Sequence, residues 1–310
     1  MKIIFLGTPD FAVNILNSIL ESKHQVVGVV CQQDKPSGRG NKLTPPKVKI
    51  FANEKGLKVY QFSNIKTEGV KILKELNADI MVTAAYGQIL SQDIISLCPK
   101  GIINVHGSLL PKYRGASPIQ QAIINDEQFT GVTIMKTDIG IDTGDILLSS
   151  KCNIEDEDTY ETLSEKLSIK GGRLCVEALD LIEKNKAIFT PQNHADATFT
   201  KTIKKEDCII DFNNNSRQIL KKVNALNPNP IAFFVLNQLS FKVYKVKPIA
   251  YKGTEKNGTI ISANSKQGLI IKCKDGAVEI VEMTAPASKK MLAKAYLNGK
   301  TLQLGSVCNE

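Results

Sequence analysis

The sequence is poor in features that define whole classes of protein. It contains no tryptophan, and its seven cysteines are scattered and never stand in Cys-x-x-Cys spacing. The cysteine pattern argues against a disulfide framework and against a zinc site, and we expect no metal. No stretch has the roughly 7–15 apolar residues of a secretory signal or the roughly 18 of a membrane span, so we expect a cytoplasmic protein without a membrane partner.

What the sequence has in excess is positive charge, and this charge is unevenly distributed. The net charge is +9; residues 207–310 carry 15 Lys+Arg against 7 Asp+Glu, whereas residues 1–206 carry 25 against 24. A basic module joined to a neutral one is typical of proteins with a polyanionic partner, most often nucleic acid. A lysine-rich solvated surface explains the charge alone equally well.

The first half of the chain alternates short apolar runs with helical patterns. The runs predict strands at 2–7, 25–31, 79–86, 101–105 and 131–137. The helical patterns lie at 13–22, 70–76, 117–125 and 159–185. Strands separated by helices predict a Rossmann-like α/β domain on a doubly wound, mostly parallel sheet.

The composition changes after this domain. A polar stretch predicts a linker over 189–205, which separates a catalytic domain over 1–188 from a second domain over 206–310. In the second domain, short apolar runs alternate with Asn, Gly and Lys turns. This density of short strands predicts a small, OB-like β-barrel.

One of only three histidines stands at the end of a predicted buried strand. Asn104 and His106 end that strand, and the next strand ends just before the acids Asp138, Asp142 and Asp145. Because ligands bind beyond the carboxyl ends of strands in a doubly wound sheet, we expect these groups at one rim.

The chemistry of these groups suits a transfer reaction. An Asn amide can stabilise a developing oxyanion, which contributes about 3 kcal/mol, and a His can accept a proton near neutral pH. No Ser or Cys is placed as a nucleophile, which favours direct transfer between two bound substrates. A structural histidine beside an acidic turn remains an open alternative.

Longer segments around these residues carry a family resemblance. The segments 104–120 (NVHGSLLPKYRGASPIQ) and 131–147 (GVTIMKTDIGIDTGDIL) resemble the signature of the folate-dependent formyltransferases. The stretches IIFLGTPDFAV near the start, AAYGQIL at 84–90, the insert at 33–49 and TKTIKKEDCIIDF at 200–212 resemble, in order and spacing, the members of that family that act on methionyl-tRNA. Together these segments cover nearly the whole chain.

The resemblance implies an enzyme whose catalytic set is Asn104, His106 and Asp142. It implies 10-formyltetrahydrofolate as the formyl donor and methionyl initiator tRNA as the acceptor, with direct transfer through a tetrahedral intermediate. It also implies that the protein is a monomer and supports translation initiation. The folate-binding residues that it implies are Tyr86, Gly87, Gln88, Ile89, Ser108, Leu109, Leu110, Pro111, Asp138 and Gly140.

The insert at 33–49 is basic and rich in proline and glycine, which predicts a loop. The resemblance implies that Lys35, Arg39, Lys42 and Lys47 contact the tRNA, with Arg39 discriminating the initiator species. A solvated surface loop is the alternative for the charge alone.

The sequence departs from the family pattern in its last third, where Ile231 stands at a position usually held by Gly. Three other functions stay open: formyl transfer to a sugar-nucleotide amine, hydrolysis of formyltetrahydrofolate, and tRNA binding without catalysis. The turn GTPDFAV after the first strand lacks GxGxxG, which argues against a dinucleotide site.

Overall fold

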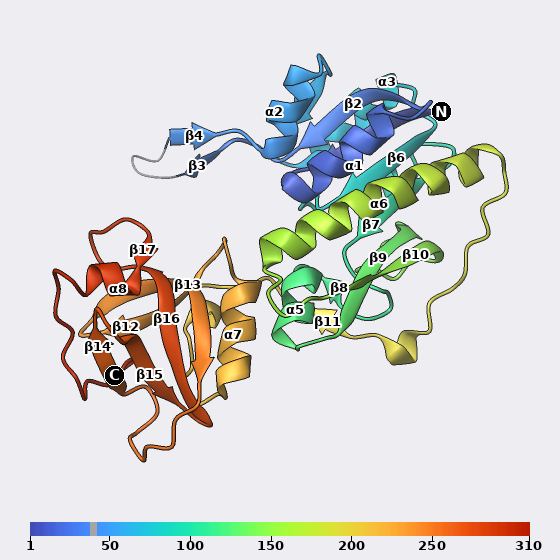
Figure 1. Cartoon of the computed structure of the whole chain (residues 1–310). Helices are drawn as coiled ribbons and strands as arrows, with labels where there is room; N and C mark the ends of the chain where they lie inside the picture. Colours follow the sequence, from blue (N-terminus) through green and yellow to red (C-terminus); the bar gives the residue numbers. More distant parts are fainter. Residues whose placement is uncertain (38–41) are drawn as a thin grey trace. The chain divides into compact units, whose positions relative to one another are not determined.

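The computed structural model describes residues 1–37 and 42–310, which form two compact units (Figure 1). The first unit comprises residues 1–118, 129–153 and 164–200, and the second comprises 119–128, 154–163 and 201–310. The domain boundaries at 188 and 205 stay a prediction. No helix among the described residues is both long and apolar enough to cross a membrane.

The first unit is built on a seven-stranded sheet in the order β10-β9-β7-β6-β1-β2-β5. The strands are β1 (Lys2–Gly7), β2 (Gln25–Cys31), β5 (Val59–Gln61), β6 (Ile80–Ala84), β7 (Ile102–His106), β9 (Phe129–Lys136) and β10 (Ile146–Asn153). Neighbouring strands from β5 to β7 pair in parallel, whereas β9 and β10 are antiparallel. The predicted mostly parallel α/β fold is confirmed.

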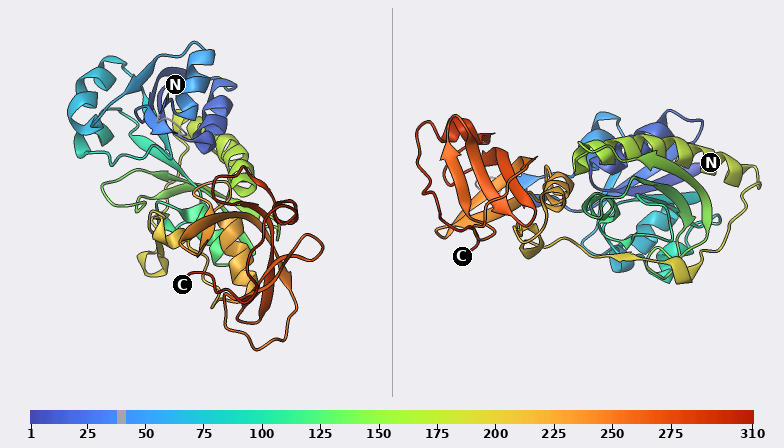
Figure 2. Two further views of the ribbon diagram at one scale, coloured as in Figure 1. Left: turned by 90° about the vertical axis from the view of Figure 1, so that its left-hand side faces the viewer. Right: turned by 60° about the horizontal axis from the view of Figure 1, so that its bottom comes forward.

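Helices cover both faces of this sheet because the central strands are apolar on both sides. On β1, Ile4 and Leu6 pack with α3 (Ile65–Glu75) and α4 (Gln92–Ile95). The alternate residues of a strand point to the opposite face. That face carries α1 (Asp10–Leu20) and α6 (Tyr160–Glu183), which run beside each other in Figures 1 and 2.

The close approach of α6 to the sheet depends on a glycine. A Cβ atom at Gly171 would lie 3.0 Å from Val105 and 3.3 Å from Val132. The backbone of α6 therefore packs directly against β7 and β9, the strands next to the candidate site.

The insert at 33–49 is not the loop that its composition predicts. Its described part forms an antiparallel hairpin of β3 (Lys35–Ser37) and β4 (Lys42–Thr44), and α2 (Lys47–Glu54) begins within it. Pro46 is the N-cap of α2, and a proline near a helix start replaces a backbone N–H that has no partner within the helix. Proline thus marks an element boundary here.

The second unit holds an antiparallel sheet in the order β12-β13-β16-β15-β14, with β17 paired to β16. Its elements are α5 (Pro118–Ile124), α7 (Ser216–Ala225), β12 (Ala232–Leu236), β13 (Leu239–Ile249), β14 (Ile260–Asn264), β15 (Gly268–Cys273), β16 (Gly276–Thr284), β17 (Met291–Leu292) and α8 (Ala293–Tyr296). The rings of Phe234 and Phe241 stack in its core with their centroids 5.1 Å apart, and they pack with Ile219 and Val223 of α7. The predicted β-rich second unit is confirmed.

Candidate functional site

Strand β7 presents Asn104 and His106 on one face because they are two residues apart. Asn104 is half-buried, and its side-chain oxygen accepts a hydrogen bond of 2.8 Å from the hydroxyl of Thr83, its register partner on β6. Since Thr83 occupies the oxygen, the amide nitrogen is the group that can donate to a bound molecule.

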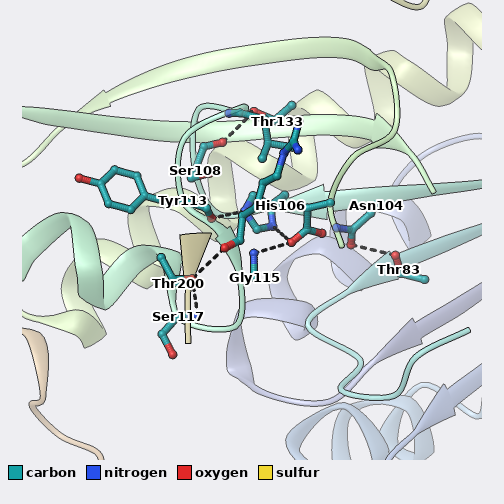
Figure 3. A network of polar contacts seen from close by, with 12 residues as sticks. Thr83, Asn104, His106, Ser108, Tyr113, Gly115, Ser117, Thr133 and Thr200 are labelled. Carbon is teal, nitrogen blue, oxygen red and sulfur yellow. Dashed lines mark hydrogen bonds and ion pairs between the residues drawn. The ribbon is translucent and has the colours of Figure 1, made fainter. Parts of the chain in front are cut away.

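His106 lies between Tyr113 and Asn104 in the polar network of Figure 3. Its Nε2 is 2.9 Å from the carbonyl oxygen of Tyr113, and because a carbonyl only accepts, Nε2 carries the hydrogen. Its Nδ1 is 3.6 Å from Oδ2 of Asp142, and that oxygen also accepts a hydrogen bond of 2.8 Å from the backbone N–H of Gly115. Asn104, His106 and Asp142 therefore meet at one rim of the sheet.

They do not meet for the reason given by strand polarity. Strand β9 runs antiparallel to β7, with His106 opposite Thr133, so its carboxyl end lies at the start of β7. Asp142 reaches His106 because the loop over 137–145 folds back along the sheet. A Cβ atom at Gly144 would lie 1.8 Å from the carbonyl oxygen of Lys136, so this return needs glycine.

Asp138 makes hydrogen bonds within its own loop, and its implied contact with the folate stays a prediction. Its carboxylate accepts hydrogen bonds from the hydroxyl of Thr143, at 2.6 and 2.8 Å, and from the backbone N–H of Gly140 at 3.1 Å. These bonds lie inside the 137–145 loop. Asp138 thus holds the shape of the loop that carries Asp142.

Non-glycine residues with positive φ surround the catalytic histidine candidate. Tyr113 has φ of +61° and Asp142 has φ of +51°, and these two residues supply the groups that face His106. Such a conformation costs of order 1–3 kcal/mol per residue and persists only where the surroundings impose it. The groups that impose it here come from residues 192–200.

That segment lies within the predicted linker. Strand β11 (Phe199–Thr200) pairs with β8 (Arg114–Gly115), and Arg114 and Gln192 are buried, with 2% and 6% of their surface exposed. The side-chain nitrogen of Gln192 donates to the backbone carbonyls of Asp142 and Gly144, at 2.9 and 2.7 Å. The lone Arg-Gly inside the signature segment was the available signal for Arg114, and the polar composition around Gln192 concealed its burial.

The positions implied for folate binding lie on the segments that flank this rim. Ser108 is buried and donates to the carbonyl oxygen of Lys112 at 2.6 Å, and the N–H of Leu110 donates to Thr133 at 3.1 Å. Gln88 accepts from the N–H of Ile65 at 3.0 Å, which ties its loop to α3. Among the remaining positions, Tyr86 is buried, and Leu109 and Pro111 are half-buried. The exposed ones are Gly87, Ile89, Asp138 and Gly140.

The positions implied for tRNA binding gather on the hairpin and α2. Lys35 and Lys47 are exposed, and Lys42 lies in β4. Arg39 falls outside the described residues. Their contact with tRNA stays a prediction.

Within residues 1–37 and 42–310, one group of side chains has the composition of a metal site. Ligand atoms of His24, Asp180 and Glu183 lie within 4.8 Å of one another. Lys23 already pairs with both carboxylates, at 3.1 and 2.7 Å, and its hydrogen bond lowers the pKa of Glu183 to about 2. Both acids are therefore matched by a cation of the chain itself.

Solved structures share this fold. One is HypX from Aquifex aeolicus in complex with tetrahydrofolic acid, with a TM-score of 0.65 and 17% identity over 96% of this chain and 47% of that chain. Another is an N-formyltransferase from Helicobacter canadensis in complex with folinic acid and dTDP-3-aminofucose, with a TM-score of 0.64 and 21% identity over 94% of this chain and 100% of that chain. At such identities the likeness concerns the fold alone.

The sequence comparisons are more specific. Residues 1–179 match the family described as formyl transferase, and residues 202–301 match its C-terminal domain. The chain is 41% identical to the methionyl-tRNA formyltransferase of Ruminiclostridium cellulolyticum over 98% of both chains, and 41% identical to that of Agathobacter rectalis over 99% of both. The chain therefore belongs to the methionyl-tRNA formyltransferase family.

Proposed function

We propose that this protein transfers a formyl group from 10-formyltetrahydrofolate to the free amino group of methionyl initiator tRNA. The observation that carries the proposal is the meeting of Asn104, His106 and Asp142 at one rim, with the Asn104 amide nitrogen available as a donor. Family membership over the full chain supports the choice of substrates.

In this reaction a bond forms between the methionyl nitrogen and the formyl carbon, and the bond from that carbon to N10 of the folate breaks. One proton leaves the attacking nitrogen and one reaches the departing nitrogen. Negative charge develops on the formyl oxygen in between. The site must therefore stabilise an oxyanion and pass a proton.

The geometry assigns these tasks to three side chains. Asn104 donates its amide N–H groups to the oxyanion, because Thr83 holds its oxygen away. Nε2 of His106 carries the hydrogen that the Tyr113 carbonyl accepts, so Nδ1, which faces Asp142 at 3.6 Å, is the ring atom that takes the proton from the attacking nitrogen and passes it to the departing N10. Asp142 stabilises the positive charge that the ring carries between these two proton transfers.

Exposed apolar side chains support a flat, partly apolar co-substrate. Ile89 lies on the loop after β6, and Ile139 and Ile141 lie on the 137–145 loop; they are 71%, 75% and 64% exposed. The two loops follow β6 and β9, the strands on either side of β7, and isoleucines this exposed on them offer apolar surface to a ligand. We assign this surface, with residues 108–111, to the pterin and benzoyl rings.

Exposed basic residues support tRNA as the acceptor substrate. In the second unit, Lys242, Lys245 and Lys247 are exposed along β13. In the first unit we assign Lys35, Lys42 and Lys47 to phosphate contacts. Arg39, outside the described residues, is the proposed discriminator of initiator tRNA, which an Arg39→Ala variant tests through the ratio of rates on initiator and elongator methionyl-tRNA.

The direct test is transfer of a labelled formyl group. The protein is incubated with 10-formyltetrahydrofolate and methionyl initiator tRNA, and formylmethionine is measured after hydrolysis of the ester. We expect His106→Ala to lose more than tenfold in rate and Asn104→Ala about 10²–10³-fold, with folate binding retained. A loss below tenfold for His106→Ala rejects its role.

The same assay separates the alternatives. Formylation of an amino-sugar nucleotide in place of the tRNA identifies a sugar formyltransferase, and release of formate without any acceptor identifies a hydrolase. Binding of tRNA with no transfer identifies a non-enzymatic protein.

A further inference from the structure

A buried polar side chain pair lies behind the catalytic rim. The guanidinium of Arg114 donates from Nε and Nη2 to the side-chain oxygen of Gln192, at 3.1 and 2.7 Å, and from Nη2 to Nδ1 of His194 at 3.2 Å. The ring of Phe199 lies 5.9 Å from the same guanidinium. The guanidinium of Arg114, a residue with only 2% of its surface exposed, thus contacts an amide oxygen, an imidazole nitrogen and an aromatic ring, and none of these contacts is with a carboxylate.

The arginine dictates how the amide of Gln192 is turned. Arginine has only donors, so the amide oxygen of Gln192 must face it and the amide nitrogen must face away. That nitrogen donates to the carbonyl oxygens of Asp142 and Gly144, at 2.9 and 2.7 Å. A single side chain therefore connects the buried cation to both ends of the turn that carries the Asp142 carboxylate.

The same segment also fixes the other partner of His106. The hydroxyl of Thr198 accepts a hydrogen bond from the N–H of Tyr113 at 2.8 Å, and its carbonyl accepts one from the N–H of Arg114 at 2.8 Å. The next N–H, that of Gly115, donates to Asp142. Residues 192–200 thereby hold the backbone at Tyr113 and Asp142. These are the two residues with positive φ whose oxygen atoms face His106.

We propose that Arg114 and Gln192 are positioning residues that hold Asp142 against His106, and this inference rests on the proposed transfer function. Burying a guanidinium against neutral acceptors costs stability, and filling the same space does not require a charge. The charge is explained if its task is to orient one amide. Removing partners that hold a catalytic group in place typically costs about 10–100-fold in activity where such partners support metal ligands, and we expect the same range here.

Gln192→Glu separates positioning from packing. A carboxylate keeps an acceptor for Arg114 and gains an ion pair, so we expect a melting temperature close to that of the wild type. Its other oxygen faces the carbonyl oxygens of Asp142 and Gly144, which repels the turn. We expect kcat to fall about 10–100-fold while KM for the folate changes less than threefold.

Two further variants complete the series. Gln192→Ala removes both halves of the connection, and we expect it to lose both kcat and stability. Asn14→Ala is the matched control, because it removes an amide that donates to Ser168 at 2.7 Å between α1 and α6. We expect Asn14→Ala to lower stability and leave kcat unchanged.

Hydrogen exchange gives a readout that does not depend on turnover. In Gln192→Glu we expect faster exchange of the amides of the 137–145 loop and unchanged exchange in β1. Unchanged exchange in that loop, or a kcat within threefold of the wild type, overturns the positioning role. If Gln192→Glu shows the expected faster exchange relative to the wild type but the wild type transfers no formyl group, the proposed function is overturned instead.

Discussion

Ile231 adopts a backbone conformation that its side chain disfavours. Its φ is +76°, in the left-handed region, where a β-branched residue is strained by about 1–2 kcal/mol. The family resemblance places glycine here, and glycine adopts this region without strain at an entropic cost of about 0.5–1 kcal/mol. We expect Ile231→Gly to leave the second unit as stable or up to about 1 kcal/mol more stable, although a half-buried side chain is lost.

The neighbouring residue provides the control for this prediction. Ala232 is fully buried in β12, so Ala232→Gly removes a methyl group and loosens the unfolded chain without relieving strain. We expect it to destabilise by about 1 kcal/mol. If thermal unfolding shows Ile231→Gly to be the more harmful of the two, the positive φ is not a source of strain.

At the level of single residues, the sequence predicted groups that contact each other but not those that hold them. Asn104 and His106 could be placed together because two residues on one strand share a face, whatever the rest of the fold does. Arg114 and Gln192 are 78 positions apart, and their burial depends on a short strand pair, β8 with β11. A two-residue strand has no periodic pattern, so its sequence looks like a linker.

Among the elements, α7 begins with a complete capping box. The side chain of Asn215 accepts from the N–H of Gln218 at 2.8 Å, and the side chain of Gln218 accepts from the N–H of Asn215 at 3.0 Å. We expect Asn215→Ala to destabilise α7 by about 1 kcal/mol, because it removes the N-cap of a helix whose following turns carry the buried residues Ile219 and Val223. Hydrogen exchange of the α7 amides measures the loss.

Gln218→Ala is the control for the cap. It removes only the reciprocal bond and leaves the Asn215 side chain in place, so we expect about half the effect. Equal effects of the two substitutions would contradict the assignment of Asn215 as the main cap.

The elements missed from the sequence have a common physical cause. Helix α7 is mostly polar in sequence, so its few apolar residues do not form a pattern that predicts a helix. The β3–β4 hairpin and α2 lie in a proline-rich stretch: Pro36 lies within the short strand β3, and Pro45 and Pro46 separate β4 from α2. The antiparallel direction of β9 was not predicted. The direction of a strand depends on the path of the connection before it, and the spacing of apolar residues within a strand carries no information about that path.

Across the whole molecule, the excess of positive charge lies in residues 207–310, where 15 Lys+Arg stand against 7 Asp+Glu, and the lysines of β13 are part of that excess. Lys245 and Lys247 stand opposite Glu282 and Glu279 of β16. These glutamates already pair with lysines outside β13, Glu282 with Lys290 at 2.8 Å and Glu279 with Lys294 at 3.3 Å. The lysines of β13 therefore remain in excess and offer a row of cations to a polyanion.

This row predicts a specific dependence of tRNA use on salt. Each lysine that contacts a phosphate releases about one counterion, so its loss lowers the slope of log(kcat/KM) against log[salt] by about one. We expect the triple change Lys242→Gln, Lys245→Gln and Lys247→Gln to reduce the slope for methionyl-tRNA by about two to three, with KM for the folate unchanged. The control replaces three exposed lysines of α3 at positions 66, 71 and 74 by Gln, which changes the net charge equally. If both triple variants show the same slope, the second unit acts through total charge and β13 is not a phosphate contact.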